Sequence, residues 1–268
     1  MRAKLPDGNP EARPNWSKCL VWSLSVPFFG HDRAMRCDVW WAHPAAETPA
    51  LVGLLDEVER GRYEAYRREA DKRRFLTGRA LIRGVAAAAL DVAPGSVTLD
   101  SSCFDCGKPH GKPRIVGASL EVSISHSGDW VALAVTSGVP VGVDVEEVRG
   151  ADVDGLAGIC FSPAELTVFQ GLPQDARQGA FFTYWARKEA VLKATGKGMS
   201  VAMSKLTLTG HDEAPRVVAS SASEVEVVSA QMSDLDRGAE YRACVAVFAD
   251  ARPEVTEHDA GGLLARLG

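Results

Sequence analysis

The chain has 268 residues, 46% of them hydrophobic, which is enough apolar surface for a buried core in one large domain or two lobes. Thirty Lys and Arg side chains stand against thirty-five Asp and Glu side chains, and the net charge of −5 has the wrong sign for general affinity to nucleic acid. No stretch approaches the roughly 18 to 20 apolar residues of a membrane helix, so we expect neither nucleic-acid nor membrane partners.

Six cysteines are too few for a disulfide scaffold in a chain of this length, and we expect a reducing, cytoplasmic environment. Residues 1–34 are predicted to form an extension ahead of the folded domain, because Met35 closely precedes the strand-like run Cys37-Asp-Val-Trp-Trp-Ala. Residues 51–90 are predicted to be mainly helical, since helix formers dominate there and apolar residues recur at helical intervals. The remaining faces of this region carry a dense basic cluster, which is typical of a solvated surface but could also bind an anion.

After Pro94-Gly95, short β-rich runs separated by turn residues predict a small antiparallel sheet from residues 97–99, 120–125, 130–135 and 141–146. A second helical region is expected over residues 163–195, followed by strands at 205–209, 216–219, 225–229 and 241–249. This succession predicts an α+β fold in two similar lobes, residues 35–140 and 141–268.

Two carboxylates share one face of the predicted strand 141–146. Side chains alternate along a strand, so the valines point one way while Asp144 and Glu146 point the other. Like charges at this spacing are unfavourable unless a cation lies nearby, and Mg²⁺ prefers oxygen ligands of this kind. An exposed acidic sheet face is the alternative.

The second helical region places Trp185, Glu189 and Lys193 on one side at intervals of four residues, with Lys188 one step around the helix. An ordinary Glu–Lys helix pair would explain the last two positions equally well.

In Ser123-Ile-Ser-His-Ser-Gly128, a strand ends in a hydroxyl-rich turn where His126 could donate to an anion or serve a structural role. A nucleophilic serine is not expected, because Ser125 and His126 would project to opposite faces of the strand and the chain lacks a Gly-x-Ser-x-Gly elbow.

The run Cys103-Phe-Asp-Cys106-Gly-Lys-Pro-His110 has the form of half a zinc knuckle. A structural zinc site takes four ligands and no second Cys pair follows at a usable spacing, so zinc and free thiols remain alternatives. The adjacent Gly111-Lys-Pro113 presents Lys112 either to a phosphate or to solvent.

Taken together, these motifs resemble a known family. Gly142-Val-Asp144, forty intervening residues and then Trp185-x-x-Lys188-Glu189-Ala190-x-x-Lys193 closely resemble the signature of 4'-phosphopantetheinyl transferases of the long, Sfp-type branch. Three further runs are similar to upstream blocks of that family: Arg73-Arg-Phe-Leu-Thr-Gly-Arg79, Gly111-Lys-Pro113 and Ser123-Ile-Ser-His126-Ser-Gly.

The resemblance implies an enzyme that uses Mg²⁺ to transfer the 4'-phosphopantetheine arm of coenzyme A to a serine of an apo acyl or peptidyl carrier protein. These carriers belong to fatty acid, polyketide or nonribosomal peptide synthases, and adenosine 3',5'-bisphosphate is released. The implied fold is a monomer of two α+β lobes related by a pseudo-twofold axis, with coenzyme A in the cleft between them.

Carried over by position, the resemblance assigns Mg²⁺ binding to Asp144, Glu146 and Glu189, and catalysis to Glu189 as base and to Lys193 at the pyrophosphate. Coenzyme A contacts are implied for Arg74, Arg79, Lys112, Ser125, His126, Lys188 and Lys193. A non-catalytic protein of the same fold that binds carrier proteins or coenzyme A, and an Mg²⁺-dependent nucleotide pyrophosphate hydrolase, are the alternative functions.

Overall fold

A computed structural model describes residues 35–227 and 229–268, so the predicted extension, residues 1–34, lies outside the described residues. The first sheet has the strand order β11-β1-β5-β4. Its strands are β1 (Arg36–Ala42), β4 (Leu120–Ser127), β5 (Trp130–Ser137) and β11 (Glu254–Asp259). Three helices accompany this sheet: α2 (Pro49–Gly53), α3 (Glu57–Ala65) and α4 (Glu69–Leu90). The predicted helical region 51–90 is thereby confirmed as three helices.

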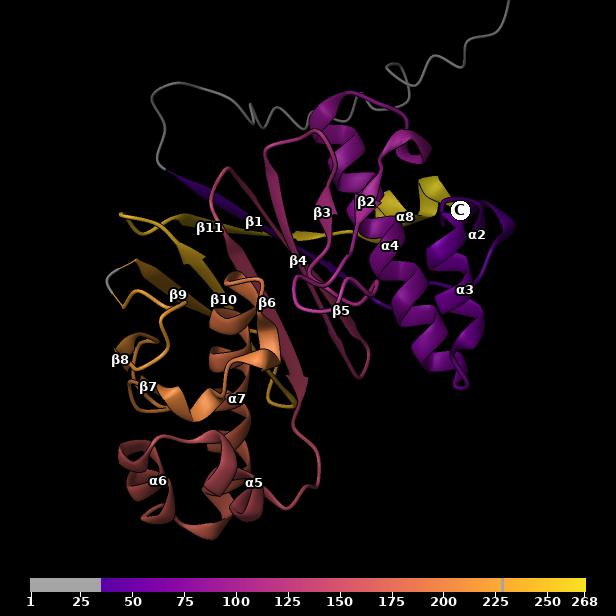
Figure 1. The fold of residues 1–268 in the computed structure, drawn as a ribbon. Helices are drawn as coiled ribbons and strands as arrows, with labels where there is room; N and C mark the ends of the chain where they lie inside the picture. The colour runs from indigo at the N-terminus through magenta and orange to yellow at the C-terminus, as the bar shows by residue number, and fades with distance from the viewer. Residues whose placement is uncertain (1–34, 228) are drawn as a thin grey trace, which may run out of the picture.

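The second sheet has the order β6-β10-β9, and all its neighbouring strands are antiparallel. It consists of β6 (Val141–Glu147), β9 (Ala230–Leu235) and β10 (Tyr241–Phe248). Its helices are α5 (Val153–Cys160), α6 (Pro163–Gln170) and α7 (Gln174–Ala194), and Figure 1 shows them on the opposite side of the molecule from α2, α3 and α4. Two further sheets have two short strands each: β2 (Leu99–Asp100) pairs with β3 (Arg114–Ile115), and β7 (Leu206–Leu208) pairs with β8 (Val217–Ser220).

The α+β class is therefore confirmed, but the pairing of the strands differs in part from the expectation. Strand β6 pairs with β10 rather than with its sequence neighbour β5. The strand predicted at residues 225–229 begins instead at Ala230, because a turn precedes it, and helix α5 has no counterpart among the predicted elements.

The two sheets face each other across a shared apolar layer. One side of β1 contributes Cys37, Val39 and Trp41 to this layer, and β6 contributes its three valines. The other side of β1 joins a separate core beneath α4, while α7 covers a third core over the second sheet. Strand β6 thus turns its valines toward the first sheet and its alternate positions, including Asp144, toward α7.

The last two elements return to the first sheet. Strand β11 pairs in parallel with β1, and helix α8 (Gly261–Leu267) packs its Leu264 into the core that contains α4. Trp41 Nε1 donates to Glu257 Oε2 at 2.8 Å, which adds a side-chain bond to the strand pairing. The chain end lies within the predicted lobe 141–268, yet it is built into the sheet and core of residues 35–140. None of the helices in the two described ranges is long and apolar enough to cross a membrane.

Candidate active site

A close approach of helix α7 to strand β6 places the acidic face of the strand beside the helix. Gly142 makes this possible, because a Cβ at that position would lie 1.9 Å from the carbonyl oxygen of Ala190. Any other residue would push the helix away from the strand. The glycine of the Gly142-Val-Asp144 motif therefore sets the distance between Asp144 on β6 and the functional side chains on α7.

Lys193 on α7 forms an ion pair with Asp144 on β6. Its Nζ lies 2.6 Å from Asp144 Oδ1 and donates to the hydroxyl of Ser125 on β4 at 2.9 Å. The same Ser125 hydroxyl donates to Asp144 Oδ1 at 2.7 Å. Asp144 and Ser125 are buried, whereas Lys193 is partly exposed. Three elements distant in sequence thus meet at one carboxylate.

The two other predicted metal ligands lie beside this ion pair. Burial, followed by the charge of Asp144, raises the pKa of Glu146 to about 7. Burial is also the main cause that raises the pKa of Glu189, with the nearby Lys193 opposing it. An incoming cation would offset this cost of burying negative charge.

The acids present oxygen atoms that suit a hard divalent cation. Asp144 Oδ2 and Glu189 Oε1 are buried and have no hydrogen-bond partner within the described chain. The carboxylate oxygens of Asp144, Glu146 and Glu189 do not all lie within 4.8 Å of one another, so these three side chains do not by themselves enclose a metal ion. Mg²⁺ commonly takes one or two carboxylates and completes its shell with water and phosphate, and the residues present fit that ion.

A row of serines joins the two sheets at this point, and the sequence interpretation missed it. Ser123 Oγ accepts from the backbone N–H of Val143 at 3.1 Å, and Ser127 Oγ accepts from that of Glu147 at 3.0 Å. These hydroxyls satisfy backbone groups on the edge of β6 that faces away from β10, where no strand of the described ranges is hydrogen-bonded to it. The alternation of serine at positions 123, 125 and 127 is the sequence signal for such a polar strand face.

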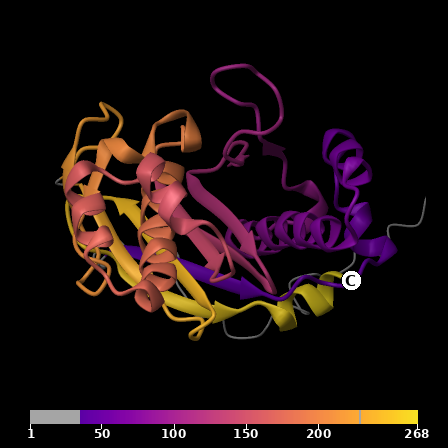
Figure 2. The ribbon, with the colours of Figure 1, turned by 90° about the horizontal axis from the view of Figure 1, so that it is seen from below.

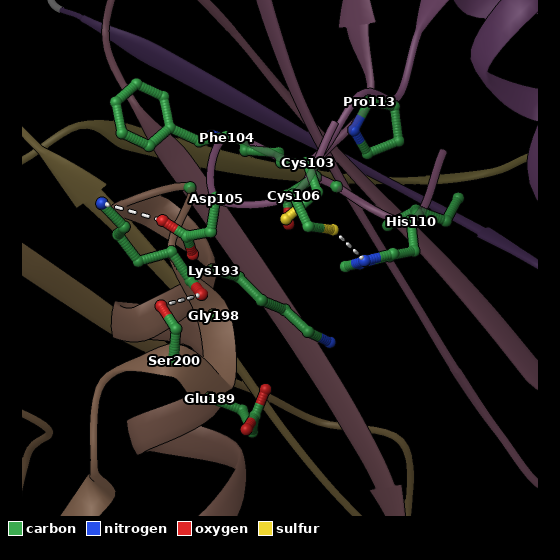
Figure 3. A pocket seen from close by; sticks show the side chains of 16 residues that line it. Cys103, Phe104, Asp105, Cys106, His110, Pro113, Glu189, Lys193, Gly198 and Ser200 are labelled. Atoms are coloured by element: carbon green, nitrogen blue, oxygen red, sulfur yellow. Dashed lines mark hydrogen bonds and ion pairs between the residues drawn. The ribbon is translucent and has the colours of Figure 1, made fainter. Parts of the chain in front are cut away.

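A pocket of about 510 Å³ opens next to the acids. Figure 3 shows Glu189 and Lys193 on the α7 side of it and the loop that carries Cys103, Cys106 and His110 on the other side. Lys112 also lines the pocket, where its Nζ forms an ion pair with Glu121 at 3.3 Å. Burial lowers the pKa of Lys112 and the charge of Glu121 opposes this shift.

The predicted phosphate contacts differ in how free their polar groups are. His126 lies on the face of β4 opposite to Ser125, where desolvation of its ring, then the charge of Lys193 and that of Arg74, lower its pKa. Arg74 donates through Nε to the Gly128 carbonyl at 2.8 Å and pairs with Asp71 at 3.0 Å. The Ser125 hydroxyl is already engaged with the ion pair.

Arg79 and Lys188 do not join the site. Arg79 lines a separate pocket of about 220 Å³, where its Nε lies 3.4 Å from Glu59. Lys188 is fully buried on the far side of α7, where Nζ lies 2.6 Å from Glu165 and donates to three backbone carbonyls, those of Cys160, Met203 and Leu206. This placement corrects the prediction that Lys188 contacts coenzyme A, because helical geometry turns position 188 about 100° away from 189.

Family models identify both halves of the chain. Residues 40–138 match the model described as "4'-phosphopantetheinyl transferase, N-terminal", and residues 140–246 match that of the "4'-phosphopantetheinyl transferase superfamily". Together they cover nearly all of residues 40–246, including the acids on β6 and the motif on α7.

Curated relatives carry the same description. The chain is 34% identical over 158 residues to 4'-phosphopantetheinyl transferase HetI of a Nostoc species, a match that covers 59% of this chain and 66% of that protein. It is 29% identical over 170 residues to a 4'-phosphopantetheinyl transferase of Bacillus subtilis, covering 63% and 72% of the two chains. For 4'-phosphopantetheinyl transferase Sfp of Bacillus subtilis strain 168, the identity is 24%, with coverage of 62% and 71%.

The matches therefore span about two thirds of the length of each of these relatives. A solved structure, the holo-[acyl-carrier-protein] synthase of Thermotoga maritima, matches 42% of this chain and 64% of that chain at 21% identity, with a TM-score of 0.35 that is too low to support an argument. On the two family models and the curated relatives, the chain belongs to the 4'-phosphopantetheinyl transferase superfamily, and Sfp is among its relatives.

Proposed function

We propose that this protein transfers the 4'-phosphopantetheine arm of coenzyme A to a serine of an apo acyl or peptidyl carrier protein, in a reaction that depends on Mg²⁺. The proposal rests on the grouping of Asp144, Glu189 and Lys193 beside a pocket. One carboxylate oxygen of Asp144 and one of Glu189 are buried and have no hydrogen-bond partner among the described residues. Family membership supports the class of reaction.

Asp144, Glu146 and Glu189 are the proposed Mg²⁺ ligands. When bound, the ion would neutralise charge on the pyrophosphate of coenzyme A and orient it. Lys193 reaches the same region and is partly exposed, so its ammonium can approach the pyrophosphate as well as Asp144. Lys112 and Lys197 line the same pocket and supply further positive charge for phosphates.

The transfer forms a bond between the carrier serine oxygen and the phosphorus that bears the pantetheine arm. The bond from that phosphorus to the bridging oxygen of the pyrophosphate breaks, and adenosine 3',5'-bisphosphate leaves. Glu189 is the proposed acceptor of the serine proton, and its raised pKa makes it a stronger base than an exposed glutamate. Lys193 is the proposed source of positive charge, or of a proton, at the leaving oxygen.

The test is a single assay with three distinguishable outcomes. The protein is incubated with coenzyme A, Mg²⁺ and an apo carrier protein, and the carrier mass and the nucleotide products are measured. Transfer raises the carrier mass by one phosphopantetheine and releases adenosine 3',5'-bisphosphate. Nucleotide cleavage without carrier modification would favour a pyrophosphate hydrolase, and absence of both products would favour a non-catalytic binding protein.

Variants of Glu189 and Lys193 test the proposed catalytic roles in the same assay. Glu189→Gln keeps the shape of the side chain but removes the base, so we expect turnover to fall by roughly 10² to 10⁴-fold. Lys193→Ala should lower it by about 10²-fold or more through loss of a charge at the pyrophosphate. Glu147→Gln is the matched control, because it removes a carboxylate of the same strand that we do not assign to the site. Full activity of the first two variants would contradict the proposal.

A further inference from the structure

The loop between β2 and β3 carries a group of side chains that the proposed function does not use. It projects from the body of the molecule in Figure 2 and forms one wall of the pocket in Figure 3. Within it, the sulfurs of Cys103 and Cys106 and a ring nitrogen of His110 all lie within 4.8 Å of one another. Cys106 Sγ and His110 Nε2 are 3.0 Å apart.

The backbone of the loop holds the two cysteines in a tight turn. The N–H of Cys103 donates to the Lys108 carbonyl, and the N–H of Gly107 donates to the Cys103 carbonyl, both at 2.8 Å. Gly107 has a φ of +70°, which glycine adopts without strain. The turn therefore brings the sulfurs of Cys103 and Cys106 within 4.8 Å of each other.

We propose that Cys103, Cys106 and His110 bind a zinc ion. Zinc bonds of about 2.3 Å to sulfur and 2.0 Å to nitrogen in a tetrahedron place neighbouring ligand atoms about 3.5 to 3.8 Å apart. The three ligand atoms lie within 4.8 Å of one another, so shifts of about 1 Å or less, within an exposed loop, would complete the geometry. Among the described residues, no fourth His, Cys, Asp or Glu belongs to this group, so water or another exchangeable ligand takes the fourth position.

The histidine distinguishes this site from a redox pair. A Cys103–Cys106 disulfide would use both sulfurs and leave His110 with no part in the chemistry, whereas zinc uses all three groups. Both thiols are free in the structure. Phe104 and Asp105, which lie between the two cysteines, contact Lys197 just after the end of α7. The Lys197 ammonium lies 3.6 Å from the Asp105 carboxylate and 4.4 Å from the centre of the Phe104 ring. A zinc ion would therefore stiffen the wall of the pocket that faces Glu189 and Lys193.

The experiment uses the full chain, reduced and stripped of metal by a chelator, then loaded with Zn²⁺ or Co²⁺ in excess Mg²⁺. We expect one zinc ion per chain by elemental analysis and a thiolate-to-cobalt charge-transfer band with Co²⁺. Cys103→Ser and Cys106→Ser each leave one thiolate ligand, so each should lower the intensity of the band to about half or less, and His110→Ala should weaken Zn²⁺ binding at least tenfold. Lys108→Ala, in the same exposed loop but with no ligand atom, is the matched control and should bind as the parent does.

The charge-transfer band separates this site from the carboxylates, because only a thiolate ligand produces it. Co²⁺ spectra without the band, or zinc binding that is equal in the parent and in Cys106→Ser, would overturn the proposal. So would rapid loss of both free thiols in air with a mass decrease of two hydrogens despite added Zn²⁺, which would identify a redox pair.

Discussion

Glu146 and Asp144 share one strand face but have different partners. Asp144 pairs with Lys193 at 2.6 Å, whereas Glu146 accepts a hydrogen bond from the Ser127 hydroxyl at 3.2 Å. Burial and the neighbouring charge of Asp144 raise the pKa of Glu146 to about 7. In protein freed of divalent cations, Glu146 therefore changes its charge near neutral pH.

This shift predicts how stability depends on pH. Because the folded pKa of Glu146 lies above its ordinary value of 4.5, the stabilisation from its proton is complete below that value and is lost as the pH rises through about 7. We expect the free energy of unfolding of the chelator-treated protein to fall between about pH 5 and pH 8, and less steeply in Glu146→Gln. Urea unfolding at both pH values measures this. Glu147→Gln is the control, and an unchanged decline in Glu146→Gln would assign the effect to another group.

For substitution of Lys188 we expect a loss of stability, unlike the loss of turnover expected for the proposed catalytic residues. Its ammonium is enclosed with the Glu165 carboxylate, and burial lowers its pKa while Glu165 opposes the shift. Lys188→Met would leave the buried Glu165 without its partner, so we expect a loss of about 3 to 5 kcal/mol in the free energy of unfolding. Urea unfolding measures the loss. Unchanged stability together with weaker coenzyme A binding would restore the role in ligand binding that the sequence motif implied.

At the level of elements, the contact of β6 with α7 determines the geometry of the site. The helix carries Glu189 and Lys193 one turn apart, and the strand carries Asp144 and Glu146 on the facing side. Gly142 allows the backbones of β6 and α7 to approach closely. The serines of β4 bind the edge of β6 that faces away from β10. Contacts to the backbone of β6 thus position the site, in addition to the ion pair of Lys193 with Asp144.

Gly142→Ala tests this arrangement. The new Cβ would lie 1.9 Å from the Ala190 carbonyl oxygen and 2.4 Å from the Ala194 nitrogen, both backbone atoms that cannot rotate away. We expect a loss of at least about 1 to 3 kcal/mol in the free energy of unfolding and weaker stabilisation by Mg²⁺ with coenzyme A. Thermal unfolding with and without these ligands measures both effects.

Gly61→Ala on α3 is the control for Gly142→Ala, because its added Cβ meets no atom within 4 Å and should leave stability equal or higher. If Gly142→Ala matched this control in stability and ligand response, the close approach of β6 and α7 would not determine the site geometry.

For the whole molecule, the chain end connects the two halves. Residues 254–267 follow the second sheet in sequence but supply an edge strand and a core helix to the first. His258 Nε2 lies 2.7 Å from Asp38 Oδ1, and Leu264 is buried beside α4. The first half is therefore incomplete without the last residues of the chain.

A chain that ends at residue 251 should consequently be unstable in its first half. We expect a lower urea midpoint and faster proteolysis within residues 35–140, located by mass spectrometry of the fragments. Leu264→Ala serves as the single-residue counterpart, with an expected loss of about 2 to 5 kcal/mol for a buried leucine. Equal midpoints for the shortened and full chains would show that β11 and α8 are dispensable.

The sequence by itself determined the features that depend on local pattern. Alternation placed Asp144 and Glu146 on one face of β6, and helical spacing placed Glu189 and Lys193 together on α7, because side-chain direction along an element follows from its period. The motif resemblance correctly identified the family. These inferences need only neighbours in sequence or the spacing of a known motif.

Only the tertiary structure decided which elements meet. The pairing of β6 with β10, the return of β11 to β1 and the serine row of β4 against β6 all join residues distant in sequence, and no local period specifies such partners. Lys188 illustrates the reason most clearly. Its place in the motif is adjacent to Glu189, but the next residue on a helix points in another direction, and the surrounding fold encloses it with Glu165 instead.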